Sequence, residues 1–481
     1  MTRATNYHEP PLWAMRSTRD RCRIVGQARH ELARSADQLI RKSHSDQRRD
    51  DAETVASELI PLCDALLWIA RHGPRQLADR QVGLAGRPMW MWGVRSVVQR
   101  QPWGKVLILG AWNYPIFLAA VQTAQALAAG NQVQLKPAPG TTAVVAEWVD
   151  AFRRAGVPAE ALQLLDSTTE AAKNAIDEGV DLVVLTGAAS TGRAVLRQTS
   201  EQLTPAIMEL SGVDAVIVLG DADHHRVINA IRFGLTFNSG ASCIGPRRVM
   251  YVRGRDEPPW VDELVACLSV CPPVIVHPAA RETVVGMITA ALDAGSVDRI
   301  GRFDPAELRR SGAMHPVVLT RVPDDHAVLQ TDLFAPVLSL LPMDSLDATV
   351  AQVNDCRYRL AASVFGSANA AATVAGQLDV GSVTINDLVA PTADPRLPFG
   401  GRRESGFGVT RGPEGLLAMT TPRVISTRSG RIAPHLSPRR DTDAELLTGV
   451  MQWNHGSGFR ERIAGLRRLT SAVRRRGRVK Q

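Results

Sequence analysis

The 481-residue sequence has few cysteines, and they do not form a pattern. None belongs to a Cys-x-x-Cys pair, and none has a closely spaced histidine partner. This spacing argues against a disulfide framework and against a structural zinc site, so each thiol has to be judged singly. The six positions are Cys22, Cys63, Cys243, Cys267, Cys271 and Cys356.

Long apolar runs are also missing. The most apolar stretches, such as residues 106–110 and 215–219, fall far short of the ~18 residues that a membrane-spanning helix needs. The first residues lack the apolar core of a secretory signal. We therefore expect a cytoplasmic protein whose short apolar stretches are buried strands.

The formal net charge of +8 is unevenly distributed. Residues 422–481 hold 14 basic and 4 acidic residues, whereas the rest of the chain holds 42 basic and 44 acidic ones. The preceding part is therefore nearly neutral, and the positive charge belongs to the tail. A basic tail is usually solvated, but it can also contact an anionic membrane surface, nucleic acid or a protein partner.

Strands and helices alternate through the middle of the sequence. Such alternation predicts a parallel sheet covered by helices, with ligands at the carboxyl ends of its strands. The expected strands are residues 106–109, 132–135, 162–165, 182–185 and 206–208, and the expected helices are 117–129, 144–154, 170–178 and 191–199. A second α/β region follows, with strands at 215–219, 248–251, 317–319 and 383–385.

The flanking segments show weaker patterns. Residues 13–69 predict two amphipathic helices with no evident chemistry, and residues 95–101 predict a hairpin or edge strand. Beyond residue 422 the composition predicts partial disorder, with one weak helical pattern at 459–473.

Three positions at expected strand ends could carry chemistry. Asn113 follows the first strand, where its amide could bind an oxyanion or form an Asx turn before Pro115. Lys136 ends the next strand, near where a ribose or phosphate would lie, although a solvated lysine is the simpler interpretation. The glycine-rich turn 186–192 leaves backbone N–H groups free for an anion, but such turns are common.

Two further side chains could react. Cys243 lies among small residues that let a ligand approach its thiol, although a lone cysteine is more often an inert core residue. Glu209 ends an apolar strand, where a carboxylate must be solvated, paired or functional.

Taken together and in this order, these residues carry a family resemblance. The sequence resembles the aldehyde dehydrogenase superfamily over residues 13–424. Its motif sequences are most similar to those of the branch that contains fatty- and aromatic-aldehyde dehydrogenases. The shared motifs are Ala-Trp-Asn-Tyr-Pro, Gln-Leu-Lys-Pro, Leu-Thr-Gly-x4-Gly, Met-Glu-Leu-Ser-Gly, Asn-Ser-Gly-Ala-Ser-Cys, Asp-Leu-Phe-Ala-Pro-Val-Leu and Pro-Phe-Gly-Gly-x3-Ser-Gly.

The resemblance implies an α/β fold with a Rossmann-type dinucleotide-binding domain, an α/β catalytic domain and a small β oligomerisation extension. We expect N-terminal helices and the dinucleotide-binding domain in 1–210, with a β-extension near 93–101. The catalytic thiol domain would span 211–392, the return segment and oligomerisation arm 393–424, and the basic tail 425–481. The resemblance also implies that the protein forms a homodimer.

By the same resemblance, Cys243 attacks an aldehyde as a thiolate, partly ionised near neutral pH. Asn113 and the backbone N–H of Cys243 hold the oxyanion, and Glu209 activates the water that hydrolyses the thioester. The cofactor is NAD or NADP, with no metal. The residues assigned to the cofactor are Trp112, Lys136, Thr186, Gly187, Gly192, Leu210, Asp332 and Phe334.

Three positions depart from the family pattern. Ala188 replaces a frequent serine, Asp332 a more frequent glutamate, and Pro139 a frequent glutamate. Without that last carboxylate a 2′-phosphate is not repelled, so we expect NADP to be tolerated beside NAD.

Two other functions stay open. A CoA-acylating aldehyde dehydrogenase would share Cys243 and Asn113 but would not need Glu209. A non-catalytic binding protein could retain the same fold and make a weak anionic-surface contact through its basic tail.

Overall fold

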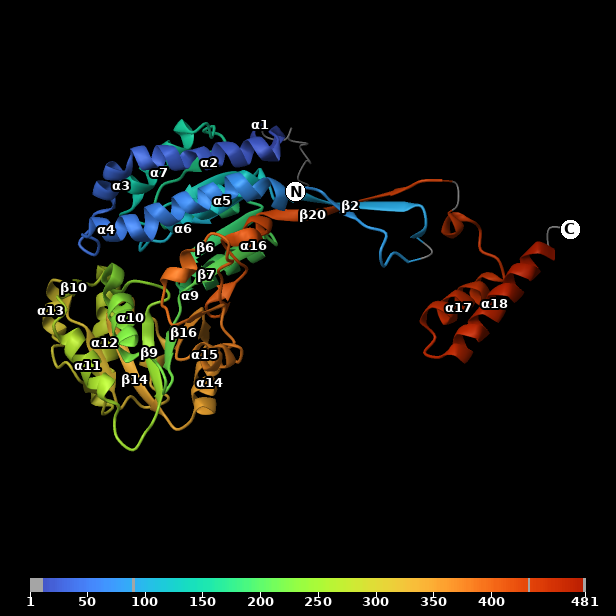
Figure 1. Cartoon of the computed structure of the whole chain (residues 1–481). Helices are drawn as coiled ribbons and strands as arrows, with labels where there is room; N and C mark the ends of the chain where they lie inside the picture. Colours follow the sequence, from blue (N-terminus) through green and yellow to red (C-terminus); the bar gives the residue numbers. More distant parts are fainter. Residues whose placement is uncertain (1–11, 89–90, 431–432, 479–481) are drawn as a thin grey trace. The chain divides into compact units, whose positions relative to one another are not determined.

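The computed structural model describes residues 12–88, 91–430 and 433–478. Contacts divide the chain into two compact units. The first comprises Met1–Arg80 and Val98–Arg423, and the second comprises Gln81–Val97 and Val424–Gln481. Both large sheets belong to the first unit (Figure 1).

A six-stranded sheet forms the first half of the larger unit, in the order β19-β7-β6-β3-β4-β5. All its neighbouring strands are parallel except β19, which pairs antiparallel to β7. The strands are β3 (Lys105–Leu109), β4 (Gln132–Lys136), β5 (Leu162–Leu164), β6 (Leu182–Gly187), β7 (Ala206–Leu210) and β19 (Gly406–Phe407).

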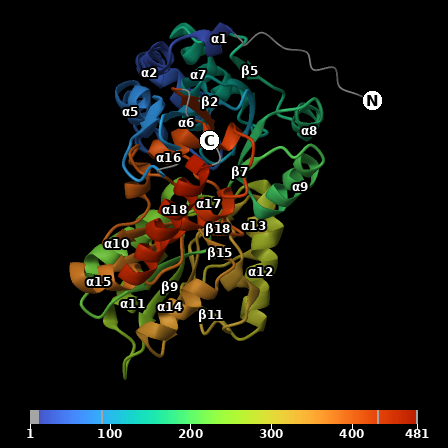
Figure 2. The same cartoon turned by 90° about the vertical axis from the view of Figure 1, so that its right-hand side faces the viewer.

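Alternate side chains of these strands enter two different cores, as the period of two in a strand requires. Val106 and Ile108 pack on one face with helices of the N-terminal half, whereas Leu107 and Leu109 pack on the other face. The first face is covered by α6 (Phe117–Ala129) and α7 (Thr142–Arg154), and the second by α8 (Thr169–Asp177) and α9 (Ala189–Ser200) (Figure 2).

The second sheet has seven strands in the order β11-β13-β14-β9-β8-β16-β17. Only β11 is antiparallel to its neighbour. Its strands are β8 (Asp214–Val218), β9 (Pro246–Val252), β11 (Val297–Asp298), β13 (Val317–Thr320), β14 (Val337–Met343), β16 (Ala361–Phe365) and β17 (Ser382–Ile385). Its helices are α10 (His224–Thr236), α11 (Pro259–Ser269), α12 (Arg281–Asp293), α13 (Pro305–Arg310), α14 (Leu346–Asp355) and α15 (Ala368–Ala375).

The α/β fold expected from the sequence is thus confirmed, as are the predicted strands of both sheets and the predicted helices of the first. The helix predicted at 117–129 has those bounds in the structure, where Gly130 ends it with a positive φ of 104°. Other ends differ from the expected ones by a few residues at most.

The N-terminal segment contains more helices than the two expected. They are α1 (Leu12–Met15), α2 (Thr18–Arg34), α3 (Ala36–Ser43), α4 (Asp51–Thr54) and α5 (Ile60–Gln76). A π-helical turn, Val55–Leu59, separates α4 from α5, and such turns are frequent at functional sites.

Three strands contain the chain positions at which one unit ends and the other begins, and they form a sheet in the order β1-β2-β20. They are β1 (Arg80–Val82), β2 (Val94–Pro102) and β20 (Thr420–Arg428). The tail forms a helical hairpin of α17 (Asp443–His455) and α18 (Phe459–Arg478). The sequence predicted part of α18 and missed α17. Gly449 and Gly465 allow the close approach, because a Cβ on Gly465 would lie 2.6 Å from the backbone nitrogen of Trp453.

Candidate active site

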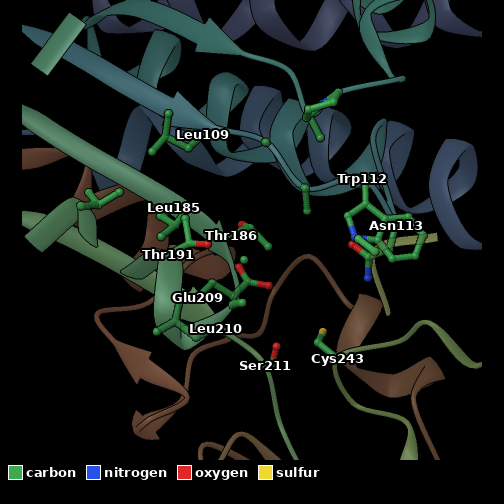
Figure 3. Close-up of a pocket in the computed structure, with 18 of the residues that line it drawn as sticks. Leu109, Trp112, Asn113, Leu185, Thr186, Thr191, Glu209, Leu210, Ser211 and Cys243 are labelled. Atoms are coloured by element: carbon green, nitrogen blue, oxygen red, sulfur yellow. The ribbon is translucent and has the colours of Figure 1, made fainter. Parts of the chain in front are cut away.

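A crevice of about 540 Å³ opens at the carboxyl ends of β3, β4, β6 and β7. Residues of the second sheet's half close its other side, among them Cys243, His277 and Phe334. Figure 3 shows Asn113, Glu209 and Cys243 around one end of this crevice. The three residues that the sequence singled out for catalysis therefore lie in one cavity, although they come from three separate segments.

Asn113 is held in place by its neighbours. Its side chain is 5% exposed, and Nδ2 donates one hydrogen bond to the carbonyl oxygen of Ala241 at 2.9 Å. An amide nitrogen has two hydrogens, so a second N–H is left for a ligand. The bond to Ala241 ties the loop after β3 to the segment that carries Cys243.

Cys243 is half-buried at the crevice, and its surroundings oppose ionisation of its thiol. Burial and the charges of Glu209, Asp214 and Asp332 all raise the pKa of its thiol above the ordinary value, and only Arg411 lowers it. These surroundings favour the neutral thiol, whereas the resemblance implies a thiol that is partly ionised near neutral pH.

Glu209 is 3% exposed, and its two carboxylate oxygens differ. Oε2 accepts a hydrogen bond from the Thr410 hydroxyl at 2.8 Å and a longer one from Gln122 Nε2 at 3.4 Å. Oε1 is buried and has no partner among the described residues. A buried acceptor without a partner is costly, so Oε1 is the atom available to a water molecule or a substrate proton.

An ion pair that the sequence did not reveal supports the Asn113 loop. Arg48 pairs with Glu58 of the π-helical turn, and both side chains are buried. Glu58 also accepts the backbone N–H groups of Ile116 and Phe117 at 2.7 and 3.0 Å, at the beginning of α6. Arg48 donates in addition to the carbonyl oxygen of Asn113. The N-terminal helices, expected to carry no chemistry, thus hold the loop that bears Asn113.

Asn238 connects the same network to the thiol segment. It has a left-handed φ of 49°, and the next residue, Ser239, has one of 56°. Its Nδ2 donates to the Asn113 carbonyl oxygen at 2.9 Å, and its Oδ1 accepts from Arg48 at 3.3 Å. Such backbone strain persists only where surrounding contacts fix it, and it is concentrated at functional sites.

The remaining predicted positions line the crevice with one exception. Trp112, Lys136, Thr186, Gly187, Leu210, Asp332 and Phe334 all line it. Gly192 does not line the crevice. It packs against Leu210, because a Cβ at this position would lie 3.0 Å from the Leu210 side chain. Its contribution is therefore the close packing of α9 on β7.

Asp332 keeps one oxygen without a partner. Its Oδ1 accepts from Arg247 Nε and from the Phe334 N–H, both at 3.1 Å, whereas Oδ2 is buried and has no described partner. Burial raises the pKa of Asp332 to about 6, against the lowering effect of Arg247. The unpartnered oxygen suits a hydroxyl donor such as that of a ribose.

His277 was missed by the sequence analysis. Its ring lies 4.3 Å from that of Trp112, and both side chains line the crevice. Burial and the charge of Arg281 lower its pKa, which favours the neutral ring. No short motif marks this histidine, so only the fold reveals its position.

The described residues offer no cluster of histidine, cysteine or carboxylate side chains that could bind a metal ion. Among these same residues, no helix is both long and apolar enough to cross a bilayer.

Comparison with known proteins gives consistent matches. The model of the "Aldehyde dehydrogenase family" matches residues 1–425. The 4,4'-diapolycopene aldehyde oxidase of Methylomonas sp is 30% identical, over 92% of this chain and 85% of that protein. Geranial dehydrogenase of Castellaniella defragrans is also 30% identical, over 71% of this chain and 72% of its own length. Among solved structures, Mycobacterium tuberculosis aldehyde dehydrogenase complexed with NAD+ superposes with a TM-score of 0.77 at 27% identity, covering 86% of each chain.

Proposed function

Because the chain belongs to the aldehyde dehydrogenase family, we propose that it oxidises an aldehyde to a carboxylic acid with NAD or NADP. The observation that carries the proposal is the convergence of Asn113, Glu209 and Cys243 on one end of a single crevice. Seven of the eight residues expected to bind the cofactor line the rest of that crevice.

The crevice fits a dinucleotide chemically. Free backbone N–H groups at the beginning of α9 can face a pyrophosphate, and Lys136 lines the same crevice at the end of β4, two strands from β6 in the sheet. The unpartnered Oδ2 of Asp332 can accept a ribose hydroxyl, and Trp112 and Phe334 offer flat apolar surfaces. When bound, the dinucleotide supplies the acceptor for hydride.

Cys243 would give up its thiol proton to water and add as the thiolate to the aldehyde carbon, which would leave a negative charge on the carbonyl oxygen. The free N–H of Asn113 Nδ2 and the backbone N–H of Cys243 would donate to that oxygen. The Asn113 loop is already fixed by Arg48 and Glu58, so little reorganisation is needed to reach this geometry.

Loss of hydride would leave an acyl thioester on Cys243, and Glu209 would remove a proton from the water that attacks it. Thr410 holds Oε2, so the unpartnered Oε1 is the oxygen that would accept this proton. Hydrolysis releases the acid and restores the thiol.

Two alternative functions would need fewer of the three residues Asn113, Glu209 and Cys243. Transfer of the acyl group to coenzyme A needs no general base, whereas this structure keeps a buried, oriented carboxylate in the crevice. A non-catalytic binding protein would not need the three reactive groups together. Both alternatives are therefore less well supported.

The test is formation of reduced nicotinamide by the purified chain with a panel of aliphatic and aromatic aldehydes and both cofactors. Cys243→Ala should abolish it, while Cys267→Ala, on the outer helix α11, should retain it. Acyl-CoA as the main product would favour the acylating alternative. If the unaltered chain forms no reduced nicotinamide with any aldehyde of the panel, the non-catalytic binding protein would be favoured.

We also infer that the chain forms a homodimer through β20. In the sheet β1-β2-β20 this strand is at an edge, and Val424 and Ile425 are 62% and 43% exposed. An uncovered edge is a template for pairing with a second chain. Light scattering should give twice the mass of one chain, and Ile425→Lys should give the single mass.

For the tail we propose a weak contact with an anionic surface. Arg460, Arg467, Arg468 and Arg474 are exposed on α18. Several arginines near one another attract anionic lipid headgroups. Deletion of 440–481 should remove binding to phosphatidylserine vesicles, and equal binding by both forms would contradict the proposal. The cytoplasmic location stays a prediction.

A further inference from the structure

His277 lines the crevice but has no part in the mechanism proposed above. It follows the short strand β10 (Val274–Ile275) and caps a single 3₁₀ turn, Pro278–Ala280, that leads into α12. Its Nδ1 accepts a hydrogen bond from the backbone N–H of Ala279 at 3.3 Å. This bond holds the ring at the beginning of the turn.

The capping bond also decides which ring nitrogen carries the hydrogen. Burial and the charge of Arg281 lower the pKa of His277, so the neutral ring is favoured at neutral pH. A neutral imidazole has one N–H donor and one acceptor nitrogen, and Nδ1 is the acceptor here. Nε2 therefore carries the hydrogen. The capping bond is the one hydrogen bond of this side chain among the described residues, so the Nε2–H is left for a ligand.

The ring of His277 packs on Trp112, which comes from the other half of the molecule. The two ring centres lie 4.3 Å apart, and the ring planes are inclined by 30°. Trp112 follows β3 of the first sheet, whereas Val276, the residue before His277, belongs to the core of the second sheet's half. The two rings thus join the opposite walls of the crevice.

This contact lies toward the Cys243 end of the crevice. Trp112 immediately precedes Asn113, which lies with Cys243 at that end (Figure 3). The Trp112 ring is also 6.2 Å from that of Phe334. Hydride passes only between atoms in contact, so the nicotinamide half of a bound dinucleotide must lie at this end, beside the carbon bound to Cys243.

The other groups at this end leave a place for a donor. The unpartnered Oδ2 of Asp332 can only accept a hydrogen when it is ionised. In the proposed mechanism, the second N–H of Asn113 binds the oxygen of the aldehyde. The nicotinamide half of the cofactor carries acceptor oxygens in its ribose and in its carboxamide. These oxygens lose water on binding, so a protein N–H that reaches one of them strengthens the complex.

We propose that the Nε2–H of His277 donates to an oxygen of the nicotinamide half of the bound dinucleotide, on the ribose or the carboxamide, and so holds the nicotinamide beside Cys243. The inference rests on the proposed function, because it concerns the cofactor of that reaction. The cap at Ala279 and the contact with Trp112 orient the ring from two directions. A donor that is already oriented loses little freedom on binding.

The experiment measures the dissociation constants of NAD, ADP-ribose and ADP by titration calorimetry, without any aldehyde. ADP contains the adenosine and both phosphates, ADP-ribose adds the second ribose, and NAD adds the nicotinamide ring. His277→Phe keeps a ring beside Trp112 but loses the N–H. His277→Gln loses the ring but keeps an N–H near the position of Nε2. The affinity for ADP also shows whether each variant retains a folded crevice.

His326→Phe is the matched control, because His326 has the same local structure. It caps the 3₁₀ turn Ala327–Gln330, and its Nδ1 accepts the backbone N–H of Val328 at 3.1 Å. His326 does not line the crevice. Its replacement removes the same kind of cap away from the cofactor, so all three affinities should stay unchanged.

His277→Phe should weaken NAD binding about fivefold, as expected for the loss of one hydrogen bond, and leave ADP binding unchanged. His277→Gln should retain most of the affinity for NAD. Weaker ADP-ribose binding by His277→Phe would place the acceptor on the ribose, and unchanged binding would place it on the carboxamide. Unchanged NAD affinity in His277→Phe would overturn the proposal. Equal losses for NAD and ADP, or equal losses in the two His277 variants, would also overturn it.

Comparison of binding with turnover separates this proposal from the proposed function. If the expected affinities are found but no aldehyde of the panel is oxidised, the activity fails and the role of His277 stands. If aldehydes are oxidised but His277→Phe binds NAD like the unaltered chain, the role of His277 fails and the activity stands. A chain that binds neither NAD nor NADP would overturn both.

Discussion

Arg48 and Glu58 form a buried ion pair that joins the N-terminal helices to the loop bearing Asn113. Glu58 binds the first backbone N–H groups of α6, and Arg48 binds the Asn113 carbonyl oxygen. One carboxylate and one guanidinium thus fix both ends of the segment 113–117. Neither residue lines the crevice, so under the proposed function both are positioning residues.

This pair predicts a combined loss of stability and activity. Arg48→Met leaves Glu58 buried and unpaired, which should lower the free energy of unfolding by about 3–5 kcal/mol. It should also lower kcat by about tenfold, because Asn113 loses its support. Urea unfolding and steady-state kinetics measure the two effects.

The matched control is Arg49→Met, since Arg49 is exposed and pairs with the exposed Asp46. It should change neither quantity. Arg48→Met combined with Glu58→Gln should recover stability more than kcat, because the buried charge is gone but the Asn113 carbonyl remains unheld. A full recovery of kcat in the double variant would rule out the positioning role.

Glu209→Gln should separate the two halves of the reaction. The amide still accepts the Thr410 hydrogen bond but cannot take a proton from water. We expect an initial burst of reduced nicotinamide close to one equivalent, followed by a steady rate about 10²-fold lower. Rapid-mixing absorbance measures both phases.

Glu404→Gln serves as the control, because Glu404 pairs with Arg193 and Arg357 rather than lining the crevice. Its kinetics should match those of the unaltered chain. A Glu209→Gln variant with neither burst nor turnover would indicate that Glu209 is needed before hydride loss.

The reactivity of Cys243 should rise with pH through the alkaline range. Its raised pKa favours the neutral thiol in the folded protein, so the thiolate fraction grows only as the pH approaches that raised value. Mass spectrometry of the alkylated peptide gives the rate at each pH. Arg411→Met should move the profile to still higher pH, because Arg411 lowers the Cys243 pKa. A rate that levels off near neutral pH would refute this.

Pro139 predicts tolerance of NADP. It lines the crevice near Lys136 and has no carboxylate to repel a 2′-phosphate. Pro139→Glu should lower kcat/KM for NADP about tenfold relative to NAD. Gln132→Glu adds the same charge at the opposite end of β4 and should not alter the cofactor ratio. An unchanged ratio in Pro139→Glu would place the adenosine ribose elsewhere.

Much of the fold could be predicted locally. The strands around residues 106 and 133 are short apolar runs, and the helix Phe117–Ala129 is stopped by Gly130, whose positive φ few other residues accept. The motifs containing Asn113, Glu209 and Cys243 also lie at strand or loop positions that the alternation predicts. The expected domain boundaries and the individual residue roles stay predictions.

The site network could not be predicted in this way. In the sequence, nothing distinguishes Arg48, Glu58 and Arg411 from the many other charged residues of a chain rich in arginine. The helical pattern of α17 is also weak by itself. Their significance depends on contacts such as Arg48 with Asn238, which lies 190 residues away. Helix α17 gains its stability from packing along α18.

The sequence by itself determined the order of strands and helices, the family motifs and the positions of the reactive side chains, because these depend on apolar spacing and turn residues over short distances. Only the tertiary structure decided which charged groups are buried, which of them are paired, and in which direction the pKa of the Cys243 thiol is shifted. Burial and Coulomb interactions depend on distance in space, and no local pattern records that distance.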